Sequence, residues 1–213
     1  MRMVEIKMTT KCTLNRSIVA VAAVLAVELA LPGSALAAEQ KPEVQRLFQS
    51  GSYEQAVEAA RDGDPASTFL AAQSLMKLDR TDRAAAELTR LRASDNPSWR
   101  SIGESGEALI AGDAGRAIEL ARRAIEADGG NPFAQYQLGL AAAKAADWGT
   151  AVAGFTRAVE LKPDFAYAHY YAALAYQRQR QLPKTAEHFD AFLRLAPDAP
   201  ERGAVQAILR TIK

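Results

Sequence analysis

Two histidines, His169 and His188, have the side chains best suited to bind a metal ion or to carry a proton near neutral pH. They stand 19 positions apart, whereas helical metal pairs usually have a close spacing, as in His-Glu-x-x-His. Neither a cysteine nor a cluster of carboxylates stands near them in the sequence. We therefore expect both histidines to have a packing role, and we predict no metal site.

The patterns of other catalytic sites are missing as well. The sequence holds a single cysteine, Cys12, and lacks the Ser-His-Asp set of a hydrolase, a phosphate-binding glycine loop and a dinucleotide fingerprint. Its acidic residues alternate with Lys and Arg along predicted helices, as is usual for solvated faces. The sequence thus predicts a protein that is not an enzyme and uses no cofactor.

Residues 1–37 have the pattern of a secretory signal peptide. A basic start is followed by an apolar run at 17–31 and then by Ala35-Leu36-Ala37. The run is shorter than the about 20 residues that a membrane-spanning helix needs, and Glu28 interrupts it. We expect cleavage after Ala37 and export to the periplasm or the medium. The alternative is an uncleaved N-terminus that anchors the protein in the inner membrane.

The charge balance argues against nucleic acid as a partner. The chain has 26 basic and 25 acidic residues, and 22 and 23 remain once four basic and two acidic residues of 1–37 are removed. No basic stripe accompanies this net charge near −1, whereas binding to phosphates requires clustered Lys and Arg.

A sequence pattern repeats every 34 residues near the C-terminus. Leu138-Gly139, Ala142, Ala151, Phe155, Ala158 and Pro163 are matched 34 positions later by Ala172-Ala173, Tyr176, Thr185, Phe189, Phe192 and Pro197. A period of this length with a break in the middle of each unit is typical of stacked helical hairpins. Because no stretch alternates apolar and polar residues, we predict an all-α superhelical array, an α-solenoid.

The pattern, which is clearest in residues 132–165, resembles the tetratricopeptide repeat family. The single predicted repeat domain, residues 38–213, divides into units at about 39–65, 66–97, 98–131, 132–165 and 166–199, with a capping helix at 200–213. In the second unit Ala85 is expected in the slot of Ala117 and Ala151. Gly103 and Gly106 lower the helix propensity of the third unit, whose first helix we expect to be the least stable.

The resemblance implies a concave groove that is lined by the first helix of each unit and holds segments of partner proteins. The predicted groove residues recur at helical spacing in the last two units: Phe133, Tyr136, Leu140, Lys144, Tyr167, Tyr170, Leu174 and Arg178. The competing interpretation of this set is packing within and between repeats. Members that clamp the acidic tail of chaperones use lysine and asparagine in the groove, whereas Tyr136, Leu140 and Tyr171 stand at those positions here. We therefore do not expect such a tail as the ligand.

The leading hypothesis is a non-catalytic scaffold or assembly factor of the cell envelope, with a protein or peptide partner in its groove. One alternative is an accessory subunit that tethers or activates an envelope or polysaccharide enzyme. Another is self-association, because the short first unit leaves an apolar face that residues 200–213 are not expected to cover. Contact with a membrane is expected only through an uncleaved signal segment.

Overall fold

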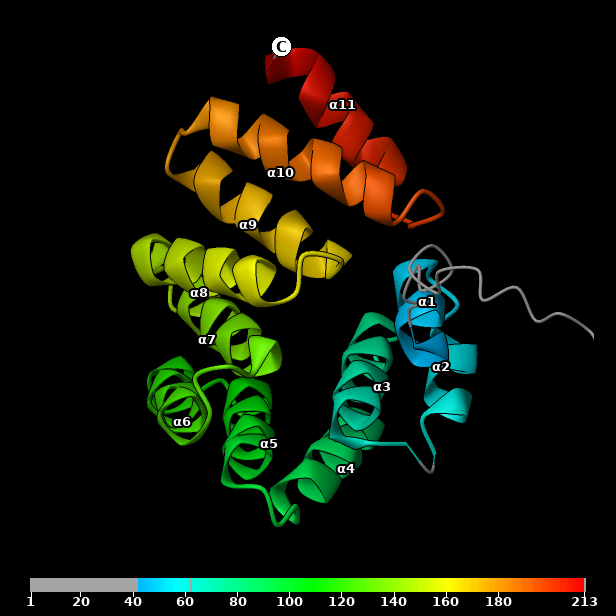
Figure 1. Ribbon diagram of the computed structural model, residues 1–213, viewed down its shortest axis with the longest axis vertical. Coiled ribbons are helices and arrows are strands. Elements are labelled where there is room, and N and C mark those ends of the chain that lie inside the picture. The colour runs from blue at the N-terminus through cyan, green and yellow to red at the C-terminus, as the bar shows by residue number, and fades with distance from the viewer. Residues whose placement is uncertain (1–41, 62, 213) are drawn as a thin grey trace, which may run out of the picture. The chain divides into compact units, whose positions relative to one another are not determined.

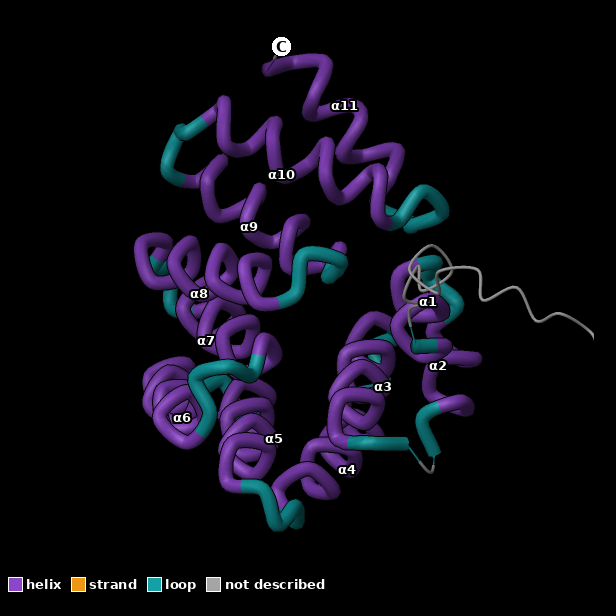
Figure 2. Tube along the Cα trace, viewed as in Figure 1, coloured by secondary structure: helices purple, strands orange, loops and turns teal. Residues whose placement is uncertain are grey.

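The computed structural model describes residues 42–61 and 63–212 of the 213-residue chain, and these form helices and no strand (Figures 1 and 2). The helices are α1 (Glu43–Gln49), α2 (Tyr53–Ala59), α3 (Pro65–Lys77), α4 (Thr81–Arg92), α5 (Pro97–Ile110), α6 (Ala114–Ala127), α7 (Pro132–Lys144), α8 (Trp148–Leu161), α9 (Ala166–Arg178), α10 (Leu182–Leu195) and α11 (Arg202–Ile212). The predicted all-α solenoid is confirmed. The predicted signal peptide lies outside the described residues.

The turn between the two helices of each hairpin has the same geometry five times. One residue in each turn has a left-handed backbone, with φ between 57° and 82°: Gly51, Asp79, Gly112, Ala146 and Arg180. The residue after it donates its backbone N–H to the carbonyl five positions earlier, as Asp147 does to Ala142 at 2.9 Å. This bond satisfies a carbonyl that the helix end would leave unpaired. The repeated turn sets the register of the hairpins.

A small buried residue follows each left-handed residue by five positions. These residues are Ala56, Ala84, Ala117, Ala151 and Thr185, and all are fully buried. Ala84 therefore takes the slot in which the sequence placed Ala85, which is only partly buried. Their small side chains allow the second helix of each hairpin to lie close to the first.

Glycines allow still closer contacts between neighbouring helices. A Cβ atom at Gly103 of α5 would lie 2.6 Å from the carbonyl oxygen of Leu88 in α4. A Cβ atom at Gly154 of α8 would lie 2.8 Å from the carbonyl oxygen of Gln135 in α7. Both distances are shorter than van der Waals contact, so only glycine fits at these positions.

The first hairpin meets the last one, and this contact closes the concave side of the array. Gln45 of α1 donates its amide Nε2 to Oδ2 of Asp164 at 2.8 Å, and Gln49 donates to the Asp164 carbonyl at 3.1 Å. The rings of Phe48 and Tyr167 lie 4.6 Å apart. In Figure 1, α1 correspondingly lies beside the connection that leads from α10 to α11. All described residues belong to one compact unit.

The end of the first hairpin is covered by the segment before α11, contrary to the expectation of an uncovered face. A Cβ atom at Gly51 would collide with the ring of Pro200. The sequence could not indicate this contact, because it joins residues at opposite ends of the domain. Val205 and Leu209 of α11 are buried, as a capping helix requires.

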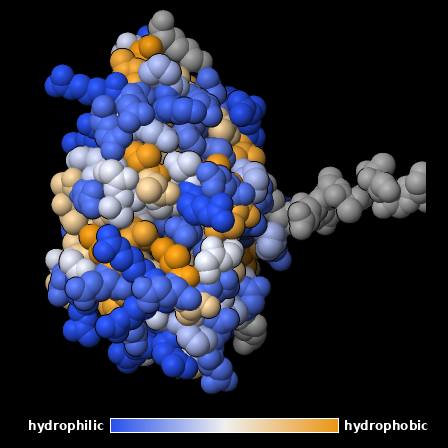
Figure 3. Space-filling model, turned by 60° about the vertical axis from the view of Figure 1, so that its left-hand side comes forward, coloured by the Kyte–Doolittle hydropathy of each residue, from blue (hydrophilic) through white to orange (hydrophobic). Residues whose placement is uncertain are grey.

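The outer surface is mainly hydrophilic on the face shown in Figure 3, where hydrophobic residues form small groups among polar ones. Within the described ranges, none of the helices has the length and apolarity needed to cross a membrane.

Candidate functional site

The predicted groove residues divide into a buried group and an accessible group. Phe133, Tyr136 and Tyr167 are at most 7% exposed and belong to the core. Leu140, Tyr170 and Leu174 are partly buried, and Lys144 and Arg178 are exposed. The expectation that all of them line an open groove is corrected in this respect, because the first two hairpins cover the buried group.

The buried group packs against aromatic residues from distant parts of the chain. The ring centre of Phe69 in α3 lies 5.5 Å from that of Phe133 and 6.0 Å from that of Tyr136, and both pairs are edge to face. Phe165, which precedes α9, lies 4.7 Å from Tyr136. Such pairs add about 0.5–1.5 kcal/mol each beyond the burial of their area. The concave side is therefore filled by the protein's own rings along this part of the array.

Arg178 is held by a tryptophan of the preceding hairpin. Its guanidinium lies 5.3 Å from the centre of the Trp148 ring in α8, a cation–π distance. This contact fixes the side chain at the end of α9, although it remains exposed to solvent.

An open cleft remains on the concave side between α3, α5 and α7. It has a volume of about 270 Å³ and is mostly apolar. Its walls are formed by Ala72, Gln73, Met76, Leu88, Gly106, Leu109, Ile110, Gln137, Leu140, Lys144 and Tyr171. Leu140 and Lys144 are thus the predicted groove residues that line it. Sequence reasoning missed Gln137, although it stands three and seven positions before these two and so shares their face of α7.

Gln137 lines this cleft and carries a buried acceptor without a partner among the described residues. Its side chain is 1% exposed, and its Nε2 donates to Ser105 Oγ at 3.1 Å. Ser105 Oγ donates its own proton to the Ala117 carbonyl at 2.8 Å, which fixes the orientation of the amide. In the part of the chain that the structure describes, Oε1 of Gln137 has no hydrogen-bond partner. An unpaired buried acceptor costs about 1–3 kcal/mol, and because this oxygen is itself buried, a donor would reach it only if neighbouring side chains moved.

The rim of the cleft carries one apolar and one cationic side chain. Met76 is 41% exposed, which is unusual for a large hydrophobic residue of this protein. Lys144 is exposed, and no acidic residue of the described ranges forms an ion pair with it.

Beside the cleft, a lysine and a glutamate meet within a group of tyrosines. Lys77 Nζ lies 2.7 Å from Oε1 of Glu201, and Tyr167 donates its hydroxyl to Oε2 at 2.8 Å. Tyr53 donates in turn to the Tyr167 hydroxyl at 3.0 Å. Burial by itself would lower the pKa of Lys77, because it disfavours the charged form. The effects of Tyr171 and Glu201 are together larger, and the pKa of Lys77 is raised. Burial would raise the pKa of Glu201, but its bonds to Lys77 and Tyr167 prevail and the pKa is lowered.

The two histidines do meet, on facing helices of the last hairpin. Their Nδ1 atoms lie 3.2 Å apart, and Nε2 of His169 lies 3.2 Å from the Pro163 carbonyl. Because that carbonyl only accepts, His169 is protonated at Nε2, and His188 donates from Nδ1. Burial lowers the pKa of His169. The pKa of His188 is lowered to about 4, mainly by burial and to a smaller extent by the neighbouring imidazole of His169. No group of three or more potential metal ligands occurs within the described residues.

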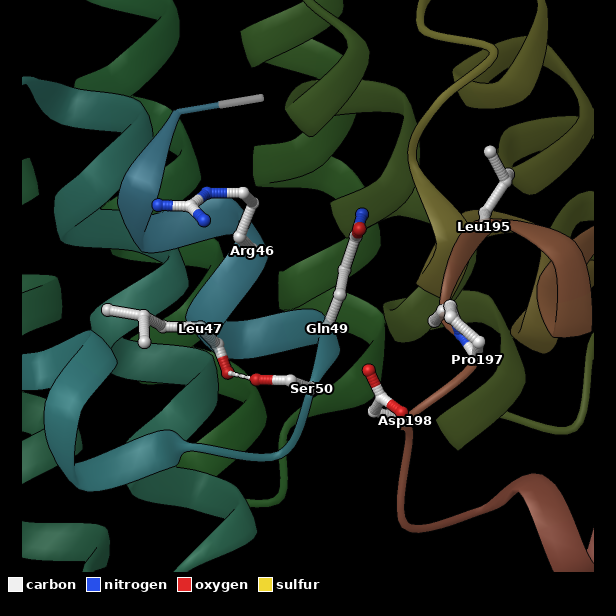
Figure 4. Close-up of a pocket in the computed structure, with 8 residues that line it drawn as sticks. Arg46, Leu47, Gln49, Ser50, Leu195, Pro197 and Asp198 are labelled. Atoms are coloured by element: carbon white, nitrogen blue, oxygen red, sulfur yellow. Dashed lines mark hydrogen bonds between the residues drawn. The ribbon is translucent and has the colours of Figure 1, made fainter. Parts of the chain in front are cut away.

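A second pocket, of about 380 Å³, lies between α1 and the end of α10 (Figure 4). Arg46, Leu47 and Ser50 line it from one side, and Pro197 and Asp198 from the other. Ser50 donates its hydroxyl to the Leu47 carbonyl at 3.1 Å. The pocket lies where the two ends of the array meet, and its polar groups come mainly from helix ends.

Comparisons with known proteins point to one family. A family model described as tetratricopeptide repeat matches residues 69–132 and 136–200, which is more than half of the chain. The comparison with curated protein sequences gave no match.

Solved structures share the helical architecture at low sequence identity. The first tetratricopeptide domain of Spaghetti (RPAP3), bound to the HSP90 peptide SRMEEVD, has a TM-score of 0.52 and 18% identity, covering 57% of this chain and 94% of that one. The TPR2AB domain of yeast Sti1, in complex with pHSP90, has a TM-score of 0.51 and 14% identity, covering 79% of this chain and 82% of that one. MamA has a TM-score of 0.46 and 16% identity, covering 72% and 94%. At these identities the likeness concerns the fold alone.

Proposed function

Since the chain belongs to the tetratricopeptide repeat family, we propose that it is a non-catalytic interaction module that binds a segment of a partner protein in the cleft between α3, α5 and α7. Two structures of similar fold hold HSP90 or its peptide, and those ligands are properties of those proteins. What supports the proposal is that helical arrays of this fold can hold a peptide.

The open, mostly apolar cleft is the observation that carries this proposal. Its volume of about 270 Å³ suits a narrow occupant, such as one or two side chains of an extended segment, rather than a whole helix. An apolar side chain of the partner would lie against Leu140 and Met76.

The cell-envelope setting belongs to the proposal as well. It is supported by the sequence pattern of residues 1–37, which is typical of export. We propose that the exported chain acts as a scaffold or assembly factor for another envelope protein. An envelope protein purified with residues 1–37 still attached would contradict cleavage and favour the anchored alternative.

A pair of matched substitutions tests the cleft. Met76→Asp places a charge at its rim, whereas Leu182→Asp places the same charge at an equally exposed apolar residue of α10, outside the cleft. Both positions are accessible, so both variants are expected to remain folded, which circular dichroism checks. Residues 38–213 of each variant would be used to capture proteins from an envelope extract, followed by mass spectrometry.

We expect the wild type and Leu182→Asp to retain the same partner and Met76→Asp to lose it. Retention by all three proteins would place the interaction on another face. Loss by both variants would point to a general effect of charge rather than to the cleft.

A further inference from the structure

The ammonium of Lys77 sits in a cage made of three tyrosine rings and a carboxylate. Nζ lies 4.9 Å from the centre of the Tyr167 ring, 5.8 Å from that of Tyr170 and 5.7 Å from that of Tyr171. Oε1 of Glu201 completes the site at 2.7 Å. Aromatic faces and a carboxylate are the groups that recognise ammonium ions in binding sites.

The cage does not depend on Lys77 for its shape. Tyr167 is fully buried and is held by the ring of Phe48 at 4.6 Å and by the hydroxyl of Tyr53 at 3.0 Å. Tyr167 in turn orients Glu201 through a hydrogen bond of 2.8 Å. A cation that replaced Lys77 would therefore find the anion and the rings already in place, which lowers the cost of binding.

Lys77 is able to leave the cage without opening the core. It is the last residue of α3, and its side chain is 25% exposed, while that of Glu201 is 16% exposed. Its flexible stem can turn toward solvent, whereas displacement of the surrounding aromatic residues would expose the core. Replacement of Lys77 by another cation is therefore a local event.

The cage and the cleft are adjacent. Tyr171 contributes its ring to the cage and also lines the cleft, and Met76, which precedes Lys77, stands at the cleft's rim. A segment with one side chain in the cleft therefore has the cage beside it.

We infer that Lys77 fills a recognition site for a cationic side chain, and that a partner segment places a lysine or arginine there when its neighbouring apolar residue enters the cleft. This inference rests on the function proposed above, and it adds the chemical class of the partner: a segment with an apolar residue next to a basic one. In the free protein Lys77 acts as an internal competitor that keeps the carboxylate paired.

Two blocked peptides that differ in one charge test the inference. The probes are Ac-Ala-Leu-Lys-Ala-NH2 and the same peptide with norleucine in place of lysine, and their dissociation constants would be measured by isothermal titration calorimetry. The proteins are residues 38–213 of the wild type, Lys77→Met, and Lys77→Met combined with Glu201→Gln. Methionine keeps the apolar stem at position 77 and removes only the competing charge.

For Lys77→Met we expect the lysine probe to bind about tenfold more tightly than the norleucine probe, from cation–π contacts and the ionic hydrogen bond. This preference for the lysine probe should be smaller in the wild type, where Lys77 competes, and smaller than in Lys77→Met after Glu201→Gln, which removes the ionic hydrogen bond and leaves the rings. If circular dichroism shows that the double variant is unfolded, Tyr170→Leu in the Lys77→Met background replaces it and should also lower the preference. Lys184→Met, which removes an exposed lysine paired with Glu187 on α10, should behave as the wild type does.

The outcomes separate the two proposals. If both probes bind Lys77→Met equally well, the cationic site is wrong, and the apolar cleft stands. If neither probe binds any of the proteins, the cleft does not take this class of segment and the inference fails, whereas the capture experiment with Met76→Asp and Leu182→Asp still decides the proposed function.

Discussion

At the scale of single residues, the histidine pair shows how burial changes a proton equilibrium. His188 is 7% exposed, and its ring stacks on that of Tyr176 at 5.4 Å. The nearest charges act in both directions, because Glu187 favours protonation of His188 and Lys184 opposes it. Burial and the second imidazole dominate, so the folded protein holds the pair neutral.

The pair predicts that acid destabilises the protein in a defined range of pH. An unfolded histidine has a pKa of about 6.5, whereas the folded pKa of His188 is about 4. Unfolding between these values therefore takes up a proton, so the free energy of unfolding should fall as the pH falls from about 6.5 to about 4. Urea unfolding at pH 7.5 and pH 5 measures this loss, which should be smaller in His188→Gln. A pKa of His188 near 6.5 by NMR titration would contradict the prediction.

At the scale of elements, the structure explains the glycine within α5 and the residues at the hairpin turns, for which the sequence indicated only helix propensity. Gly103 weakens its helix as an isolated segment, but in the fold it lets α5 approach the backbone of α4. The left-handed turn residue, in contrast, is a glycine in only two of the hairpins, at Gly51 and Gly112. The other three turns have Asp79, Ala146 or Arg180 in the left-handed conformation, which costs free energy for a residue with a Cβ atom.

Gly103→Ala should lower the free energy of unfolding by about 1–3 kcal/mol, because the added methyl group overpacks the contact between α4 and α5. A matched control is Gly203→Ala in α11, where an added Cβ atom meets nothing within 4 Å. Alanine there should stabilise the protein by up to about 1 kcal/mol through helix propensity. Urea unfolding of both variants measures the difference, and equal effects would show that propensity alone governs position 103.

Ala146→Gly should stabilise the turn between α7 and α8 by about 1 kcal/mol. Its φ of 60° lies in the left-handed region, which is unfavourable for residues with a Cβ atom and open to glycine. Gly112 occupies the equivalent position in the turn between α5 and α6 and has free space around it. The reverse change, Gly112→Ala, should therefore destabilise the protein by a similar amount. Thermal unfolding of the two variants should therefore shift in opposite directions.

At the scale of the whole molecule, the contact between the first and last hairpins changes how stability is distributed. In an open repeat array each unit contacts only its neighbours, and stability is a sum of local terms. Here Phe48 of α1 packs on Tyr167 of α9, and Gln45 bonds to Asp164. The two ends therefore stabilise each other directly.

Phe48→Ala should expose this coupling, with a loss of about 3–5 kcal/mol, as is usual when a buried aromatic side chain is removed. Hydrogen exchange of backbone amides should become faster in α9 as well as in α1 and α2. Leu120→Ala is the control, because Leu120 of α6 belongs to a small separate cluster with Ala108, Ala117 and Ala141. Its effect should stay within α5, α6 and α7, and acceleration confined to α1 and α2 in Phe48→Ala would contradict the coupling.

Much of the fold and part of the site could be predicted from the sequence, because helical hairpins are encoded locally. The 34-residue period, the spacing of small residues and the helix breakers each depend on neighbours within one unit. The same helical spacing placed Leu140 and Lys144 on one face, and the structure brings both to the cleft. Arg178 was predicted as a groove residue, and in the structure it is exposed at the end of α9.

Only the tertiary structure decided which part of that face is open. Asp164 meets Gln45 across 119 positions, and Glu201 meets Lys77 across 124 positions, so no spacing rule connects them. These contacts depend on the curvature summed over all hairpins, to which every packing contact adds a small rotation. They bury Phe133, Tyr136 and Tyr167, leave the cleft beside Gln137 open, and place Lys77 within the tyrosine cage. The sequence by itself thus determined the repeating unit, and the closure of the array determined the surface on which a partner can bind.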